Sequence, residues 1–488
     1  MPTAFNASVN QAPGIYVTQD TAGLIPASII PFNRVYMVGP AGTGEYGRPI
    51  QIHSYEDALN VFGVAGITAA AIRLFFRNCP QGLMFFSRVP IAQTFEVQVT
   101  NTSGTFELGI DGNTVSYTAE AGDDASAIAA ALGDLINNPL NGISKLVFSD
   151  VLPSSSDTLT LRALDPTGSA LTATTSGDVD VTDVTGIEPR DLDYIWTIES
   201  SYDPDENRPG YLIAPEAFSE LGPESTSVGQ AMGQHAGRIG FNWVALVDGK
   251  PDLFTTEAML EDGKRYTASQ GELAYYARYV EDFEGIEVPL SAAVAGIALL
   301  RFREQGFQFP PAGTRYPIQG ITRIVGPPIK RTHQEVLNPE GINVPRDLPN
   351  VGPCVYGART RSDNPYFRFV HIPVVLSIIS KTFEEAFTNE IFTAVDGAGV
   401  LFTRLKMTAN AILYQVWKDG GLYGATPNDA YEVICGEINN PALSLEEGIV
   451  NLEAYVAPAP LMERMPIKVL RTAIGQVQIT AQNVLSAA

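Results

Sequence analysis

The chain has 488 residues, of which 45% are hydrophobic, and it carries a formal net charge of −23 at pH 7. This length suffices for roughly three domains of about 150 residues each, and the apolar content excludes wholesale disorder. The negative charge argues against general nucleic-acid binding and against adhesion to an anionic membrane, because both need basic patches.

The three cysteines are far apart and form no CxxC pair, which argues against a disulfide framework or a zinc ribbon. The first residues, MPTAFNASVNQAP, lack the basic and apolar segments of a signal peptide. The most apolar stretches, 291–300 and 371–380, are too short to cross a bilayer. A soluble chain without membrane insertion is therefore expected.

The N-terminal third begins with a short strand, Pro13–Thr18, that has no partner nearby in the sequence. Residues 34–90 then alternate strand and helix, which predicts an α/β sheet. The loop after the strand at 34–38 is rich in glycine, but its spacing does not match a phosphate-binding loop. The loop is therefore interpreted as a turn that needs positive φ angles, and no cofactor is expected.

The composition changes between residues 93 and 187, where thirteen acidic residues face two basic ones. Strand patterns occur at 95–99, 105–110, 114–118, 145–149 and 158–163, and one amphipathic helix is predicted over 124–137. Asp111-Gly112-Asn113 has the composition of a hairpin turn. This stretch is interpreted as an inserted, acidic, β-rich domain.

The α/β pattern resumes at Arg190. Strands are predicted at 194–198, 210–214 and 241–247, with a helix over 228–239 between the last two. Strand–helix–strand order predicts a parallel sheet with right-handed crossovers. Residues 273–280 and 292–302 are expected to be helical or mixed segments.

Catalytic chemistry finds little support. His235 and Asp248 could contribute to a Ser/His/Asp set, but the chain has no GxSxG elbow that would place a serine beside them. It has only four histidines and no HExxH pair. Neither a hydrolase nor a metal enzyme is therefore expected.

The charge reverses between residues 301 and 371, where ten basic residues face five acidic ones. An acidic and a basic zone on one chain predict complementary surfaces between copies. The alternative is a scatter of solvated surface charges, which contribute little as single pairs.

The C-terminal third is predicted to start with strands at 353–360 and 367–373 and helices at 374–388 and 399–418. A three-stranded sheet with one dry side is expected from the runs at 431–435, 449–455 and 466–470. The residues inferred to form this sheet, which would accept strands from other subunits, are Tyr431, Val433, Val450, Leu452, Ile467 and Val469. Residues 474–480 alternate like a further strand and also have no local partner.

Several segments, in this order, resemble those of contractile tail sheath proteins of bacteriophages and related injection particles. They are PGIYV at 13–17, LNPEGIN at 337–343, VYGART at 355–360, FRFVHIP at 367–373, the run from 420 through YEVIC at 431–435, and APAPLME at 457–463. The sequence departs from the family's pattern at Pro373, Val374 and Gly436. Resemblance is dense from 337 to 470 and looser over 13–90 and 190–336.

This resemblance implies a multidomain α/β and α+β protein. The expected parts are an N-terminal arm (1–24), a discontinuous α/β middle domain (25–92 with 188–350), an inserted β-sandwich-like domain (93–187), an α+β assembly domain (351–473) and a C-terminal arm (474–488). The middle domain is expected to have a subtilisin-like fold without catalysis.

The implied function is mechanical. Copies are expected to form hexameric rings that stack around a tail tube, between a baseplate and a tail terminator, and to contract. The chain is thus expected in the virion, after assembly in the host cytoplasm, with no direct contact to nucleic acid. Another structural or host-binding phage protein, or an α/β hydrolase, is the alternative.

Two sets of residues are the predicted contact sites. The arms that link subunits are expected at Gly14, Ile15, Tyr16 and Val17 and at Gln476, Val477, Gln478 and Ile479, which would complete the C-terminal sheet of a neighbour. Arg404, Lys406 and Lys418 on the 399–418 helix are expected to face the tube, although an ordinary solvated helix face would show the same charges.

Overall fold

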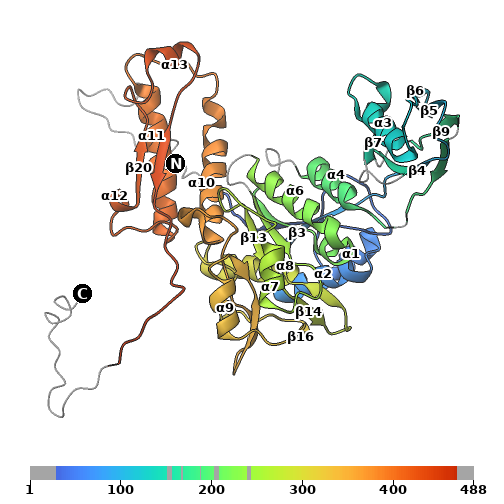
Figure 1. Cartoon of the computed structure of the whole chain (residues 1–488). Coiled ribbons are helices and arrows are strands. Elements are labelled where there is room, and N and C mark those ends of the chain that lie inside the picture. Colours follow the sequence, from blue (N-terminus) through green and yellow to red (C-terminus); the bar gives the residue numbers. More distant parts are fainter. Residues whose placement is uncertain are drawn as a thin grey trace, which may run out of the picture.

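The computed structural model describes residues 29–150, 157–165, 169–177, 179–186, 188–202, 208–238 and 243–469. The predicted arm residues Gly14–Val17 and Gln476–Ile479 lie outside this part of the chain. The described residues form a mixed α/β body, a small β-rich unit to one side of it, and a helical C-terminal part on the other side (Figure 1).

A seven-stranded sheet forms the centre of the body. Six strands run parallel and β2, at one edge, pairs antiparallel with β3, so the parallel sheet predicted from strand–helix–strand order is confirmed. The strands are, in spatial order, β17 (Ile342–Asn343), β13 (Leu273–Tyr276), β12 (Trp243–Asp248), β11 (Gly210–Ile213), β1 (Arg34–Gly39), β3 (Leu83–Arg88) and β2 (Ile50–Ile52).

Helices cover both faces of this sheet. Because strand side chains alternate, Val35 and Met37 of β1 join one core while Tyr36 and Val38 join the other. Tyr36 stacks on Trp243, with ring centroids 4.1 Å apart. One face carries α1 (Tyr55–Phe62), α2 (Gly66–Asn78) and α8 (Ser291–Gln305), and the other carries α4 (Asp191–Ser201), α5 (Pro215–Glu220), α6 (Ser225–Gly237), α7 (Thr256–Gly263) and α9 (Arg331–Leu337).

Smaller antiparallel ladders border the body. One has the order β15–β14–β16 and the other joins β18 to β19. Their strands are β14 (Tyr279–Asp282), β15 (Glu287–Pro289), β16 (Ile321–Ile324), β18 (Pro345–Leu348) and β19 (Gly352–Val355).

The acidic insertion, between residues 94 and 183, has a core of its own. A four-stranded sheet of order β10–β4–β8–β7 and a three-stranded sheet of order β6–β5–β9 enclose this core with α3 (Ala125–Asn137). The strands are β4 (Thr94–Val99), β5 (Thr105–Ile110), β6 (Asn113–Thr118), β7 (Val147–Asp150), β8 (Thr158–Ala163), β9 (Ala173–Ser176) and β10 (Val179–Asp183).

The C-terminal part is built on two long helices, α10 (His371–Phe387) and α11 (Val400–Lys418), which pack together. Buried residues of both helices belong to the same hydrophobic cluster as α2 and α8. Short helices α12 (Pro427–Ala430) and α13 (Ala442–Glu446) flank the strand pair β20 (Tyr431–Ile434) and β21 (Glu453–Val456).

Two of the strands predicted between residues 190 and 373 are wrong. Residues 194–198 belong to helix α4, where Tyr194, Thr197 and Ile198 are buried at helical spacing; a short apolar run does not by itself distinguish strand from helix. Residues 367–373 keep only the single bridge Arg359–Phe369, because α10 already begins at His371. Pro373 falls in the first turn of that helix, where its missing N–H costs no hydrogen bond.

Candidate assembly surface

The strand pair β20–β21 carries two of the residues predicted for the acceptor sheet. Tyr431 is paired with Val456 and Val433 with Ala454, in antiparallel register. Val433 is buried, and the Tyr431 hydroxyl donates to the carbonyl oxygen of Asn410 on α11 at 3.4 Å. Among the described residues these two strands pair only with each other as a sheet, so each keeps a second edge with backbone donors and acceptors.

The predicted third strand of this sheet is wrong for the described chain. Residues 461–469 have no regular secondary structure, and Ile467 and Val469 are 76% and 89% exposed. The middle strand is also shorter than predicted, since it begins at Glu453. Val450 and Leu452 precede it and pack instead on a small core around Leu401.

Asparagine side chains explain the late start of β21. The backbone N–H of Asn451 donates to the side-chain oxygen of Asn440, and its carbonyl accepts from the side-chain amides of Asn439 and Asn440. These bonds satisfy the backbone of Asn451 without a strand neighbour. A pattern of alternating hydrophobicity carries no sign of such a competitor.

After β21 the chain is held against the C-terminal part. The N–H of Tyr423 donates to the carbonyl of Ala457 at 2.8 Å, and the N–H of Ala459 donates to the carbonyl of Gly421 at 2.9 Å. Nε2 of the buried His371 lies 2.9 Å from the carbonyl oxygen of Ala459. Because a carbonyl can only accept, Nε2 carries the proton. Burial lowers the pKa of His371, while its hydrogen bond to Ala459 opposes that change.

Glu463 makes the last strong attachment before the chain leaves the body. The Arg359 guanidinium donates from Nε and Nη2 to its two carboxylate oxygens, at 3.0 and 2.6 Å, and Asn338 Nδ2 donates at 2.7 Å. The Arg359 side chain is 6% exposed and that of Glu463 22%. Burial opposes ionisation of Glu463, but the hydrogen bonds from Arg359 and Asn338 outweigh it and lower the pKa of this carboxyl. We refer to these three residues as the clasp.

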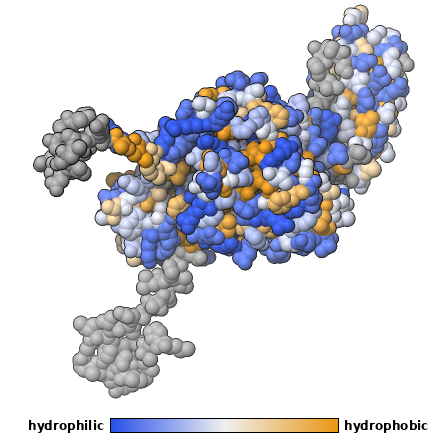
Figure 2. All heavy atoms as spheres, turned by 90° about the horizontal axis from the view of Figure 1, so that it is seen from below, coloured by the Kyte–Doolittle hydropathy of each residue, from blue (hydrophilic) through white to orange (hydrophobic). Residues whose placement is uncertain are grey.

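Beyond the clasp, apolar side chains lie in the open. Met465, Ile467 and Val469 are all more than 60% exposed. Figure 2 shows a hydrophobic projection from the side of the molecule, where the described part of the chain ends. Burying a side chain of this kind gains about 1.5–3 kcal/mol relative to leaving it exposed, so the segment offers binding energy to whatever covers it.

Helix α11 presents the predicted cationic residues on its exposed side. Leu401, Leu405, Ile412 and Val416 face the core, whereas Arg404, Lys406 and Lys418 are exposed. Arg404 already forms an ion pair with Glu390 at 2.5 Å. The proposal that these residues face a tube stays a prediction.

The residues considered for catalysis lie in different environments. Asp248, at the end of β12, accepts a hydrogen bond from the Ser291 N–H at 2.8 Å, and burial raises its pKa to about 7. His235, on α6, packs edge-on against Trp243. In the part of the chain that the structure describes, no cluster of three or more His, Cys, Asp or Glu side chains could hold a metal ion. None of the helices described there is long and apolar enough to cross a membrane.

Sequence reasoning missed the clasp entirely. Arg359 and Glu463 are 104 positions apart, and each alone has the appearance of an ordinary surface charge. No periodicity or local spacing relates them, so only the folded chain shows that they meet.

Similarity to known proteins adds a further finding. No protein-family model matches the chain. The tail sheath protein of Vibrio phage KVP40 is 24% identical over 253 residues, which cover 51% of this chain and 34% of the phage protein. The chain thus spans about a third of the length of that relative.

Solved structures resemble the chain over nearly its whole length. The sheath complex of an extracellular contractile injection system, PVC, in its contracted state has a TM-score of 0.60 and 16% identity, and the match covers 95% of this chain and 98% of that one. The helical sheath of the anti-feeding prophage in its contracted state has a TM-score of 0.57 and 18% identity, over 94% and 99% of the two chains. The chain therefore has the fold of contractile sheath proteins, and the resemblance to the tail sheath family inferred from its sequence is confirmed.

Proposed function

We propose that the chain is the structural subunit of a contractile tail sheath. Copies form hexameric rings that stack helically around a tail tube, and contraction drives the tube through a host cell envelope so that a genome or another cargo can pass. The observation that supports this best is the segment after the clasp, which leaves the body extended and with its apolar side chains uncovered.

Strand addition is the proposed joint between subunits. The pair β20–β21 has open edges, and a strand from another chain satisfies such an edge with backbone hydrogen bonds while pockets receive its alternate side chains. We assign the donor strands to Gly14–Val17 and Gln476–Ile479. Joints of this kind allow rigid bodies to move relative to one another while the subunits stay connected.

The remaining contacts follow from the same proposal. The basic stretch 301–371 and the acidic insertion provide complementary charge for contacts between rings. Baseplate, tube and tail terminator proteins are the partners, and the sheath resides in the virion after assembly in the host cytoplasm. The middle domain, with a subtilisin-like fold in this proposal, serves as a rigid mechanical element without catalysis.

Deleting residues 464–488, or residues 1–24, is expected to leave a folded monomer that cannot form sheaths. Each deletion removes a proposed donor strand and leaves the described body intact. Negative-stain electron microscopy of purified protein checks this: the full chain is expected to form long contracted tubes, and both truncations only discrete particles. Circular dichroism verifies that the truncated chains are folded.

A point variant sharpens this test. Ile467→Ser combined with Val469→Ser removes apolar surface from the projecting segment without shortening the chain, and is expected to reduce tube formation at least tenfold. Phe283→Ser is the matched control, because Phe283 is 68% exposed on the turn between β14 and β15. Normal tubes from either truncation, or equal losses in the point variant and its control, would contradict the proposal.

Charge reversal on α11 tests the contact with the tube. Lys406→Glu with Lys418→Glu is expected to weaken assembly around a purified tube, because both side chains are exposed and a complementary surface would be repelled. The measurement is the sheath bound per tube at low and at moderate salt. Glu437→Lys serves as a control for a charge change elsewhere on the C-terminal part. Unchanged binding by the double variant would assign these lysines to an ordinary solvated face.

A further inference from the structure

The acidic insertion is attached to the body by very little structure. Its hydrophobic core is separate from the two cores of the body, and Figure 1 shows it standing to one side of the large sheet. Among the described residues, none of its helices or strands packs broadly against an element of the body. What sets its orientation must therefore lie where the chain enters and leaves it, near residues 89–93 and 184–190.

Arg162 reaches from the insertion to the body. Leu159 and Leu161 of β8 point into the insertion's own core, so Arg162 points to the opposite face of that sheet. A residue on that face would be solvated if the insertion stood alone. Its side chain is nevertheless only 9% exposed, because the body and the two connecting segments cover it.

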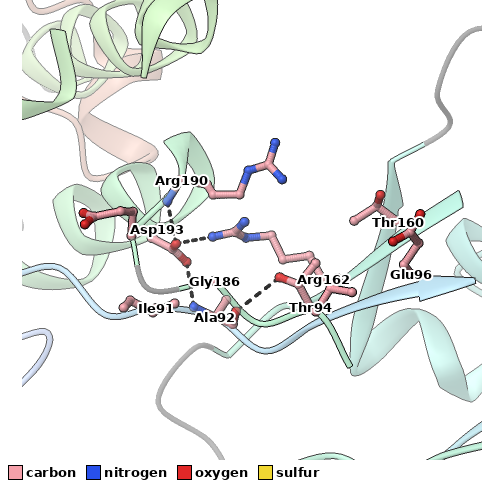
Figure 3. Close-up of a pocket in the computed structure, with 11 residues that line it drawn as sticks. Ile91, Ala92, Thr94, Glu96, Thr160, Arg162, Gly186, Arg190 and Asp193 are labelled. Carbon is pink, nitrogen blue, oxygen red and sulfur yellow. Dashed lines mark hydrogen bonds and ion pairs between the residues drawn. The ribbon is translucent and has the colours of Figure 1, made fainter. Parts of the chain in front are cut away.

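Asp193 gathers the parts that meet there. One of its carboxylate oxygens accepts from the N–H of Ala92, in the segment that enters the insertion, at 3.2 Å. The other accepts from the N–H of Arg190, in the segment that leaves it, at 2.8 Å, and forms an ion pair with the Arg162 guanidinium. The Asp193 side chain is 1% exposed. Figure 3 shows all three attachments converging on this carboxylate.

A cavity of about 290 Å³ lies beside these attachments, between the insertion and the body. Thr94, Glu96 and Thr160 line it from the insertion, and Ile91 and Arg190 line it from the connecting segments and the start of α4. Well-packed interfaces leave few spaces larger than a water molecule. The insertion and the body are therefore not closely packed beside the Asp193 attachments.

We propose that Asp193 is a latch that fixes the orientation of the insertion, and that loss of its contact with Arg162 frees the insertion to turn about the two connecting segments. The Asp193 carboxylate binds both connecting segments and also Arg162. Arg162 is the only buried cation among the described residues of the insertion. The insertion folds around its own core, so it stays intact when the latch opens. This inference concerns the single chain and does not depend on the proposed function.

The test measures the distance between the insertion and the body. Spin labels on Ser116→Cys in the insertion and Glu257→Cys in the body report it by pulsed electron paramagnetic resonance. Both positions are exposed, whereas the three native cysteines are buried, so labelling is selective. The full chain is expected to show one narrow distance distribution. Arg162→Met is expected to broaden it at least twofold or to shift its mean.

Arg162→Met is the decisive variant because Arg162 takes no part in the helix start at α4. Asp193→Asn is expected to act in the same direction, although Asp193 also caps that helix through Arg190. Glu224→Gln is the control, since it breaks the exposed pair between Arg190 and Glu224 at the same helix start. A narrow, unshifted distribution in folded Arg162→Met, or equal broadening in Glu224→Gln, would overturn the latch.

Discussion

Replacing Arg359 by methionine is expected to release the C-terminal segment and to lower the free energy of unfolding by about 3–5 kcal/mol, the usual cost of breaking a buried ion pair from one side. Methionine keeps much of the side-chain volume but leaves Glu463 partly buried without its bidentate partner. Urea unfolding measures the loss of stability. Release of the segment is measured by hydrogen exchange at two amides. The Tyr423 N–H donates to the segment and the Ala459 N–H donates from it.

Arg464→Met is the matched control for this prediction. Arg464 approaches the same carboxylate, at 3.9 Å, but its side chain is 80% exposed. Exposed pairs contribute about 0–1 kcal/mol, so the control should change the free energy of unfolding by less than that. If the two arginine variants lose similar stability, the clasp is not the attachment that holds the segment.

Acid should weaken the same attachment. The fold lowers the pKa of His371. The contribution of neutral His371 to folding stability is therefore complete above the ordinary pKa of 6.5, and it is lost as the pH falls through the folded-state pKa. The pKa of Glu463 is lowered as well, so its contribution is complete above 4.5 and is lost as the pH falls through its folded-state value. The protection factor of the Ala459 amide, which corrects its exchange rate for the intrinsic pH dependence of exchange, should therefore fall as His371 and Glu463 become protonated.

Asp248→Asn is expected to stabilise the protein by a few kcal/mol at pH 8. Asp248 is fully buried, and one of its carboxylate oxygens has no hydrogen-bond partner among the described residues. Burial raises its pKa from 3.8 to about 7, and the hydrogen bond from the Ser291 N–H opposes the rise. Each pKa unit corresponds to about 1.4 kcal/mol. Asparagine keeps an acceptor for the Ser291 N–H and carries no charge to bury.

The sign of the pH dependence follows from linkage. Folding favours the protonated carboxyl, so the folded state binds more protons than the unfolded state between about pH 4 and pH 7, and stability falls as the pH rises through that window. The variant should show a flatter profile there. Some slope should remain, because burial also raises the pKa of Glu216 to about 7.

Chemical unfolding at pH 5 and pH 8 checks this prediction. Asp252→Asn is the control, since it removes the same charge from an exposed turn near the end of β12 and should change stability by less than about 0.5 kcal/mol. A loss of stability in Asp248→Asn at pH 8 would contradict the prediction, because it would show that the ionised Asp248 carboxylate stabilises the fold.

Much of the fold was predictable where the information is local. The strands β4, β5, β6 and β8 and the helix α3 of the insertion match their predicted ranges closely, because a sheet with one buried face shows strict alternation. The predicted turn at Asp111-Gly112 has positive φ angles at both residues, as a tight hairpin requires. The strands β1 and β12 were recognisable as continuous apolar runs, since helices cover both of their faces.

The secondary-structure predictions were wrong for short segments whose apolar residues fit more than one kind of structure. Tyr194 and Ile198 satisfy both strand and helix spacing, and the capping carboxylate of Asp193 decides in favour of the helix. Residues 466–470 alternate like a strand in the sequence, but 466–469, the part that the structure describes, have no strand beside them among the described residues. Alternation indicates that a segment could pair; it does not indicate whether a partner is present.

By itself, the sequence determined the class of the protein: alternating α/β elements, an acidic insertion, and an ordered set of motifs typical of tail sheath proteins. The tertiary structure alone decided how the parts are held together. The clasp of Arg359 with Glu463 and the latch of Arg162 with Asp193 each join residues from different parts of the chain. Periodicity indicates which face of an element is buried, whereas a buried ion pair between residues far apart in the sequence forms only when folding brings both residues together.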